Sequence, residues 1–63
     1  MAEAVVKWVE KDGQEKTTTC PNLDLALAEA KYHPNARVVS ERMEYQYDAD
    51  GRLQYRHLKW WER

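Results

Sequence analysis

The side chains best suited to chemistry in this sequence are one cysteine and two histidines, Cys20, His33 and His57. A thiol beside an imidazole can act as a nucleophile, but it also needs an oxyanion hole and a group that orients the imidazole. No motif supplies these, and a chain of 63 residues leaves little room for a cleft that excludes water. We therefore predict that the protein is not an enzyme, and that Cys20 is a small, partly buried apolar residue.

Metal and cofactor sites are not expected either. The two histidines have no carboxylate or thiol at ligand spacing, and the stretch "DADG" at 48–51 lacks the other ligands of a calcium loop. Gly13 and Gly51 are isolated, so they do not form a loop that cradles phosphate. A lone cysteine permits no internal disulfide, so stability must come from packing or from association with another chain.

The segment "GRLQYRHLKWWER" interleaves basic residues with aromatic rings, which is typical of surfaces that stack on single-stranded nucleic acid. Its basic residues outnumber Glu62; they are Arg52, Arg56, Lys59 and Arg63. The strand before it has the opposite balance, with Glu41, Glu44, Asp48 and Asp50 against Arg42. Cross-strand pairs would neutralise both segments, and the net charge of the chain is −1, so nucleic-acid binding is the alternative hypothesis.

The aromatic residues favour a protein partner. The chain has three Trp and four Tyr but no Phe, and rings with a polar group are enriched at protein interfaces. Our leading hypothesis is a small protein-binding module, an inhibitor or adaptor of the kind encoded by phages and mobile elements, that docks on a larger protein. The predicted partner-binding residues are Trp60, Trp61, Tyr32 and Leu25, with Arg56 and Lys59 as steering charges. A self-associating structural domain, with a homodimer built on an edge strand or on the same rings, is a further alternative.

Four elements are expected to position these residues. A strand over 4–10 places Val6 and Trp8 on one side, and a threonine-rich segment over 15–20 predicts an edge strand, although 11–21 could also be a loop. A helix should run from Leu23 to about Tyr32, capped by Asn22 and ended by Pro34. A long hairpin over 36–61 follows, with its turn at 48–51.

The hairpin turn fixes a register. Pairing 48 with 52 places Tyr47 opposite Leu53, Tyr45 opposite Tyr55 and Met43 opposite His57, so one face is aromatic. In a regular strand Trp60 and Trp61 would point to opposite faces, so at most one of them could join the core.

The helix is apolar on two sides. Its core stripe consists of Leu23, Ala26, Leu27 and Ala30. Leu25, Ala28 and Tyr32 lie on the far side, at the i, i+3, i+7 spacing of residues that anchor a helix in an apolar groove of a partner. The sequence leaves open whether this second side binds a partner, or whether Tyr32 folds over the following loop and Leu25 covers the edge of the sheet.

Together these elements predict a single α+β domain over 1–63: an antiparallel sheet of three to four strands with one helix on one face, in the order β(β)αββ. No stretch is long and apolar enough for a transmembrane helix, and the first residues do not match a secretory signal, so we expect a cytoplasmic protein without membrane partners.

Two partial resemblances point to the same class. The stretch "LDLALAEAKYHPNARVV", followed by a hairpin with a glycine turn, is similar to the helix and following strands of PEPSY domains, which are associated with peptidase inhibition. The same helix, placed after two short strands and before "YHP", also resembles the layout of the small bacteriophage inhibitor of bacterial RNA polymerase, which has no counterpart of the C-terminal hairpin. Both resemblances imply a small protein that acts by docking on something larger. Neither assigns a function to a particular residue of this sequence.

Overall fold

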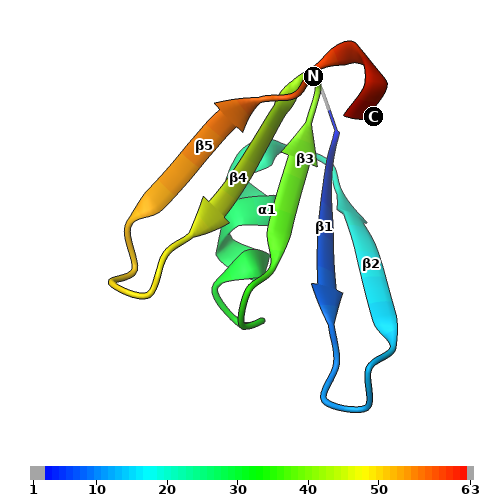
Figure 1. The fold of residues 1–63 in the computed structure, drawn as a ribbon, viewed down its shortest axis with the longest axis vertical. Coiled ribbons are helices and arrows are strands. Elements are labelled where there is room, and N and C mark those ends of the chain that lie inside the picture. Colours follow the sequence, from blue (N-terminus) through cyan, green and yellow to red (C-terminus); the bar gives the residue numbers. More distant parts are fainter. Residues whose placement is uncertain (1–2, 63) are drawn as a thin grey trace.

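A five-stranded antiparallel sheet carries one helix on one face in the computed structural model, which describes residues 3–62 (Figure 1). In chain order the elements are β1 (Ala4–Val9), β2 (Glu15–Cys20), α1 (Leu23–Ala30), β3 (Arg37–Ser40), β4 (Met43–Tyr47), β5 (Leu53–His57) and a short 3-10 helix η1 (Trp60–Glu62). The strands lie in the order β2-β1-β3-β4-β5. The expected α+β fold is confirmed, with five strands in place of three to four.

The first hairpin forms as a regular pair of strands. Residues 15–20 are a strand rather than a loop, and β2 lies at an edge of the sheet, as its threonine content predicted. The turn is closed by a hydrogen bond of 2.9 Å from the Glu10 N–H to the Gln14 carbonyl. Gly13 has φ +87° in this turn, a conformation that glycine adopts without steric cost.

The helix begins at the predicted cap. Asn22 has extended backbone, and its side-chain oxygen accepts the Leu25 N–H at 2.9 Å. The helix ends at Ala30, two residues earlier than expected, because the next residues form tighter turns of the 3-10 type. The N–H groups of Tyr32 and His33 donate to carbonyls three residues back, before Pro34 ends the turn.

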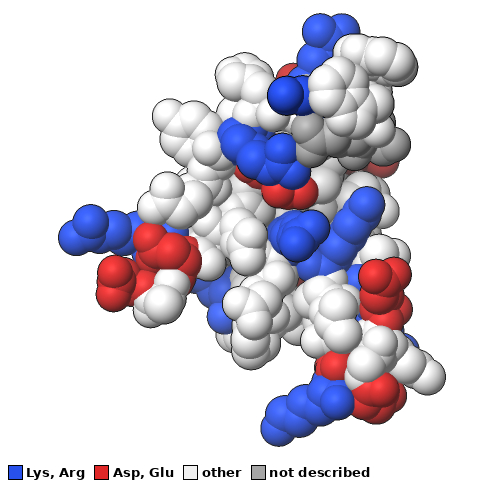
Figure 2. Space-filling model, viewed as in Figure 1, with Lys and Arg blue, Asp and Glu red and all other residues white. Residues whose placement is uncertain are grey.

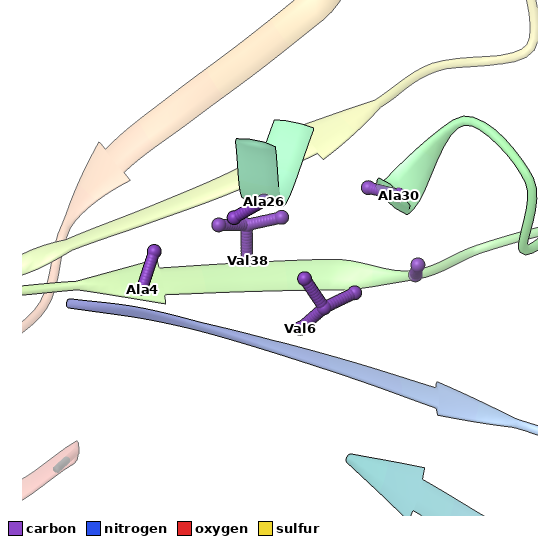
Figure 3. Packing of buried hydrophobic residues seen from close by; sticks show 6 residues of the cluster. Ala4, Val6, Ala26, Ala30 and Val38 are labelled. Atoms are coloured by element: carbon purple, nitrogen blue, oxygen red, sulfur yellow. The ribbon is translucent and has the colours of Figure 1, made fainter. Parts of the chain in front are cut away.

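The core lies between α1 and the central strands, and it is made of small side chains. The buried apolar residues are Ala4, Val6, Ala26, Ala30, Ala36 and Val38. Figure 3 shows Val6 and Val38 extending from β1 and β3 toward the helix alanines. Larger residues pack around this centre without being fully buried: Trp8, Cys20, Leu23, Leu27, Tyr45 and Tyr47. Cys20 is thus half-buried, as the sequence predicted.

The expected long strand over 36–47 was wrong in one respect, because it is two strands joined by a tight turn. β3 pairs with β1 as far as Ser40 opposite Ala4, which is the first residue of β1. The chain then folds back at Glu41, where φ is +55°, to pair Ser40 with Met43. The split places β3 in the middle of the sheet.

The turn and the register of the second predicted hairpin are confirmed, although its last strand ends at His57 and does not continue to 61. β4 and β5 pair Met43 with His57, Tyr45 with Tyr55 and Tyr47 with Leu53. Gly51 has φ +81°, as the predicted turn requires. Asp48 organises the turn, because its side chain accepts the N–H groups of Asp50 and Arg52, each at 2.9 Å.

Candidate protein-binding surfaces

The two adjacent tryptophans lie beyond the end of the sheet. Pairing continues one residue past β5, where the Leu58 N–H donates to the Arg42 carbonyl at 2.7 Å, and the chain then turns into η1. The Trp60 and Trp61 rings meet edge to face, with centroids 5.5 Å apart. Their exposed fractions are 83% and 61%, so neither joins the core. The alternation of a regular strand does not apply to them, because the strand ends before they begin.

A cation completes this tryptophan surface, which we define as Lys59, Trp60 and Trp61. The Lys59 ammonium lies 5.2 Å from the centroid of the Trp61 ring, within the range of a cation–π interaction. The contact holds a positive charge beside two rings that face solvent. Three of the predicted binding residues meet here.

The outer side of the helix is also uncovered. Leu25 is 52% exposed and Tyr32 is 79% exposed, and Ala28 between them is exposed as well. Most of Tyr32 and about half of Leu25 therefore face solvent. The outer helix surface, defined as Leu25, Ala28 and Tyr32, keeps the spacing that was predicted for a partner groove.

Arg56 belongs to neither of these surfaces. Its Nε donates to Glu44 Oε1 at 3.1 Å, across the β4–β5 pair on the face opposite the helix. This is the cross-strand neutralisation that the charge pattern predicted. Within the described residues, Arg56 thus pairs across the sheet with Glu44, whereas Lys59 lies beside the Trp61 ring.

An exposed surface on the helix side of β5 was not predicted from the sequence. α1 packs on β1, β2 and β3 and reaches as far as β4, while β5 lies outside its reach. Tyr55 is consequently 68% exposed and Leu53 39% exposed, beside the half-buried Tyr45 and Tyr47. The register already placed these residues on one face. Which strands the helix covers depends on the order of the strands, which the sequence did not show.

A second missed feature is a pair of like charges on the other face of the sheet. Lys7 on β1 lies directly opposite Arg37 on β3, and both are exposed. Within residues 3–62 neither makes an ion pair. Figure 2 shows Lys and Arg side chains over the middle of this face, with one acidic group beside them, and most other Asp and Glu side chains near the β1–β2 and β4–β5 turns. Such a pair costs stability unless an anion or a partner compensates it.

The cysteine and the histidines are held apart. Cys20 and His57 belong to the same row across the sheet but lie on opposite edge strands, four strand spacings or about 19 Å apart. His33 stacks on Trp8 with centroids 3.8 Å apart, and its Nε2 lies 3.0 Å from Glu29 Oε1. This contact ties the loop after the helix to β1, which is a structural use of the imidazole.

The described part of the chain, residues 3–62, contains neither a metal-ligand cluster nor a membrane-spanning helix. Among its side chains, no group of three or more His, Cys, Asp and Glu is placed to hold a metal ion. None of its helices has the length and apolar character to cross a membrane.

Comparison of the chain with protein-family models, curated proteins and solved structures found no match. The exposed surfaces, with their geometry and chemistry, are therefore the features from which a function can be proposed.

Proposed function

We propose that the protein is a small, non-catalytic protein-binding domain that docks on a larger protein through the tryptophan surface. The observation that supports this proposal is that the buried side chains are small whereas large aromatic side chains are exposed. The largest fully buried side chains are Val6 and Val38, whereas both indole rings of η1 face solvent. Two exposed tryptophans add nothing to the folding free energy of a domain that buries little apolar surface. A partner that covers both rings would gain binding free energy from the apolar area that it buries.

The size of that gain follows from the area of the rings. A tryptophan buries roughly 150–250 Å² when it is covered, at about 25 cal/mol per Å². Allowing for ordering on association, truncation of a central tryptophan costs at least about 2 kcal/mol of binding free energy. Lys59 lies at the rim of this surface, where a charge affects association rate more than affinity.

The outer helix surface is a second contact in this proposal. Leu25 and Tyr32 flank Ala28 on one side of the helix, as in helices that lie in an apolar groove. In the same proposal the protein acts in the cytoplasm as an inhibitor or adaptor of the phage type.

Affinity capture with matched variants tests the proposal. The intact chain, a Trp60→Ala/Trp61→Ala variant and a Leu25→Ala/Tyr32→Ala variant are compared as baits, after circular dichroism has shown that all three are folded. We expect the intact chain to retain a discrete protein that the tryptophan variant loses, with no effect of nuclease and little effect of salt.

Two results would contradict docking through the rings. Retention of the same partner by the tryptophan variant would place the contact elsewhere, and the helix variant then decides whether the outer helix surface carries it. A nucleic acid captured in a salt-sensitive way, and lost on Lys59→Ala, would replace protein binding with the alternative hypothesis.

A further inference from the structure

β5 is an edge strand whose outer side faces solvent. It is the last strand in the order of the sheet, and all five of its residues are exposed. Figure 1 shows the chain leaving the end of β5 toward the first residues of β1, away from the outer edge of β5. The chain segment that follows β5 therefore does not cover this edge within the described residues.

The direction of the backbone groups on β5 follows from two printed hydrogen bonds. The Asp48 N–H donates to the Arg52 carbonyl at 2.9 Å, and the Leu58 N–H donates to the Arg42 carbonyl at 2.7 Å. Antiparallel pairs alternate between bonded and non-bonded residues, so the even-numbered residues 52–58 direct their backbone groups toward β4. Leu53, Tyr55 and His57 therefore direct theirs outward.

We propose that β5 pairs with β5 of a second copy of this chain, antiparallel and about a two-fold axis through Tyr55. In this register Tyr55 lies opposite Tyr55 of the second copy, and Leu53 lies opposite His57 of the second copy. Every residue with outward backbone groups meets another such residue, so all of the outward N–H and C=O groups of Leu53, Tyr55 and His57 become paired. The two sheets join into one continuous sheet, and the interface is isologous.

The side chains are self-complementary in the same register. On the helix side, Tyr55 and Leu53, which the helix leaves exposed, gain apolar neighbours. On the other side, Gln54 lies opposite Arg56 of the second copy, so no two like charges are directly opposed. Edge strands that resist such pairing carry prolines or inward charges, and β5 has neither on its helix side.

The other edge strand is less suited to this pairing. β2 directs the backbone groups of Glu15, Thr17 and Thr19 outward, by the same alternation from the bond between Glu10 and Gln14. Its two-fold pairing would bring threonine against threonine and would cover little apolar surface. We therefore assign the dimer to β5 and use Thr17, the corresponding position on β2, as the control.

Sedimentation equilibrium tests the edge. We expect the intact chain to sediment at twice its 7.5 kDa. In the backbone, proline at position 55 removes only an outward N–H, which edge strands tolerate, so Tyr55→Pro should keep the fold. Because it removes this N–H and the Tyr55 ring from the interface together, it should raise the dissociation constant by about tenfold or more. Thr17→Pro, which has the same backbone effect on β2, should leave the dimer unchanged.

Disulfide trapping tests the register even if the proline variant fails to fold. In a Cys20→Ser background, chains with Gln54→Cys are mixed with chains with Arg56→Cys, which leaves Leu53, Tyr55 and His57 intact. The two positions face each other at about 4.5 Å between Cα atoms in the proposed register, so the mixed disulfide should exceed both homodimers. Positions 54 and 54 are offset along the strands and should link slowly.

A chain that sediments as a monomer would overturn the proposal, whether or not a strand of another protein binds this edge. So would a dimer that survives Tyr55→Pro in a folded chain, or disulfides formed in statistical proportion. The proposal is independent of docking through the tryptophan surface, because Trp60→Ala/Trp61→Ala should remain dimeric.

Discussion

Replacement of Glu41 by glycine should stabilise the protein, because Glu41 occupies a conformation that suits glycine. Its φ of +55° lies in the left-handed region, in the two-residue turn between β3 and β4. A residue with a Cβ atom pays roughly 1–2 kcal/mol in that region. Two-residue hairpin turns accordingly favour glycine where φ is positive.

The magnitude follows from two opposing terms. Glycine removes the steric cost, but it also loses about 0.5–1 kcal/mol more conformational entropy on folding than a residue with a side chain. The balance is a gain of about 0.5–1 kcal/mol for Glu41→Gly. For a domain of this size that gain raises the melting temperature by about 4–8 °C.

Urea unfolding followed by tryptophan fluorescence, together with thermal unfolding by circular dichroism, measures the effect. Arg42→Gly is the matched control, because Arg42 does not have positive φ and should lose about 0.5–1 kcal/mol. Glu41→Gln tests the charge, since it removes the carboxylate and keeps the Cβ atom. If Glu41→Gly destabilised the domain as much as Arg42→Gly, the explanation from backbone conformation would be refuted.

Two further predictions concern the electrostatics of the fold. The pKa of Asp48 is lowered from 3.8, first because the Arg52 N–H donates to its carboxylate and then because the Gln54 side chain does. A lowered folded pKa stabilises the protein above pH 3.8 and loses that effect as pH falls through the folded value, so Asp48→Asn should flatten the acid side of the stability curve measured by urea unfolding. Arg37→Glu turns the like-charge pair with Lys7 into an attractive one and should add up to about 1 kcal/mol of unfolding free energy. At about 1 M salt, where the Debye length falls to about 3 Å, that difference should disappear, and a gain that persists there would exclude charge as its cause.

Local features of the fold were predictable where adjacent residues decide them. The cap at Asn22, the glycine turn at Gly51 and the register of β4 with β5 depend on short-range hydrogen bonds and φ preferences, and each was confirmed. The small residues of the helix core stripe also gave a correct prediction, because their spacing alone places Ala26 and Ala30 on one side.

Long-range features escaped prediction because they depend on which strands become neighbours. The turn at Glu41 has no glycine, asparagine or proline to mark it, and it directly follows the pairing of Ser40 with Ala4 of β1. The opposition of Lys7 and Arg37 follows from the same pairing of β1 with β3. Tyr55 is exposed because the eight-residue helix contacts the strands from β2 to β4 but does not contact β5.

The candidate surfaces also combine features that the sequence determines with features that the tertiary structure determines. By itself the sequence determined which side chains have the chemistry of an interface, since Trp and Tyr combine apolar area with a polar group wherever they lie. Only the tertiary structure decided that Trp60 and Trp61 leave the sheet together, that Arg56 is engaged by Glu44, and that β5 ends as an exposed edge. The physical reason is that residue chemistry is local, whereas burial and strand order result from contacts between segments far apart in the chain.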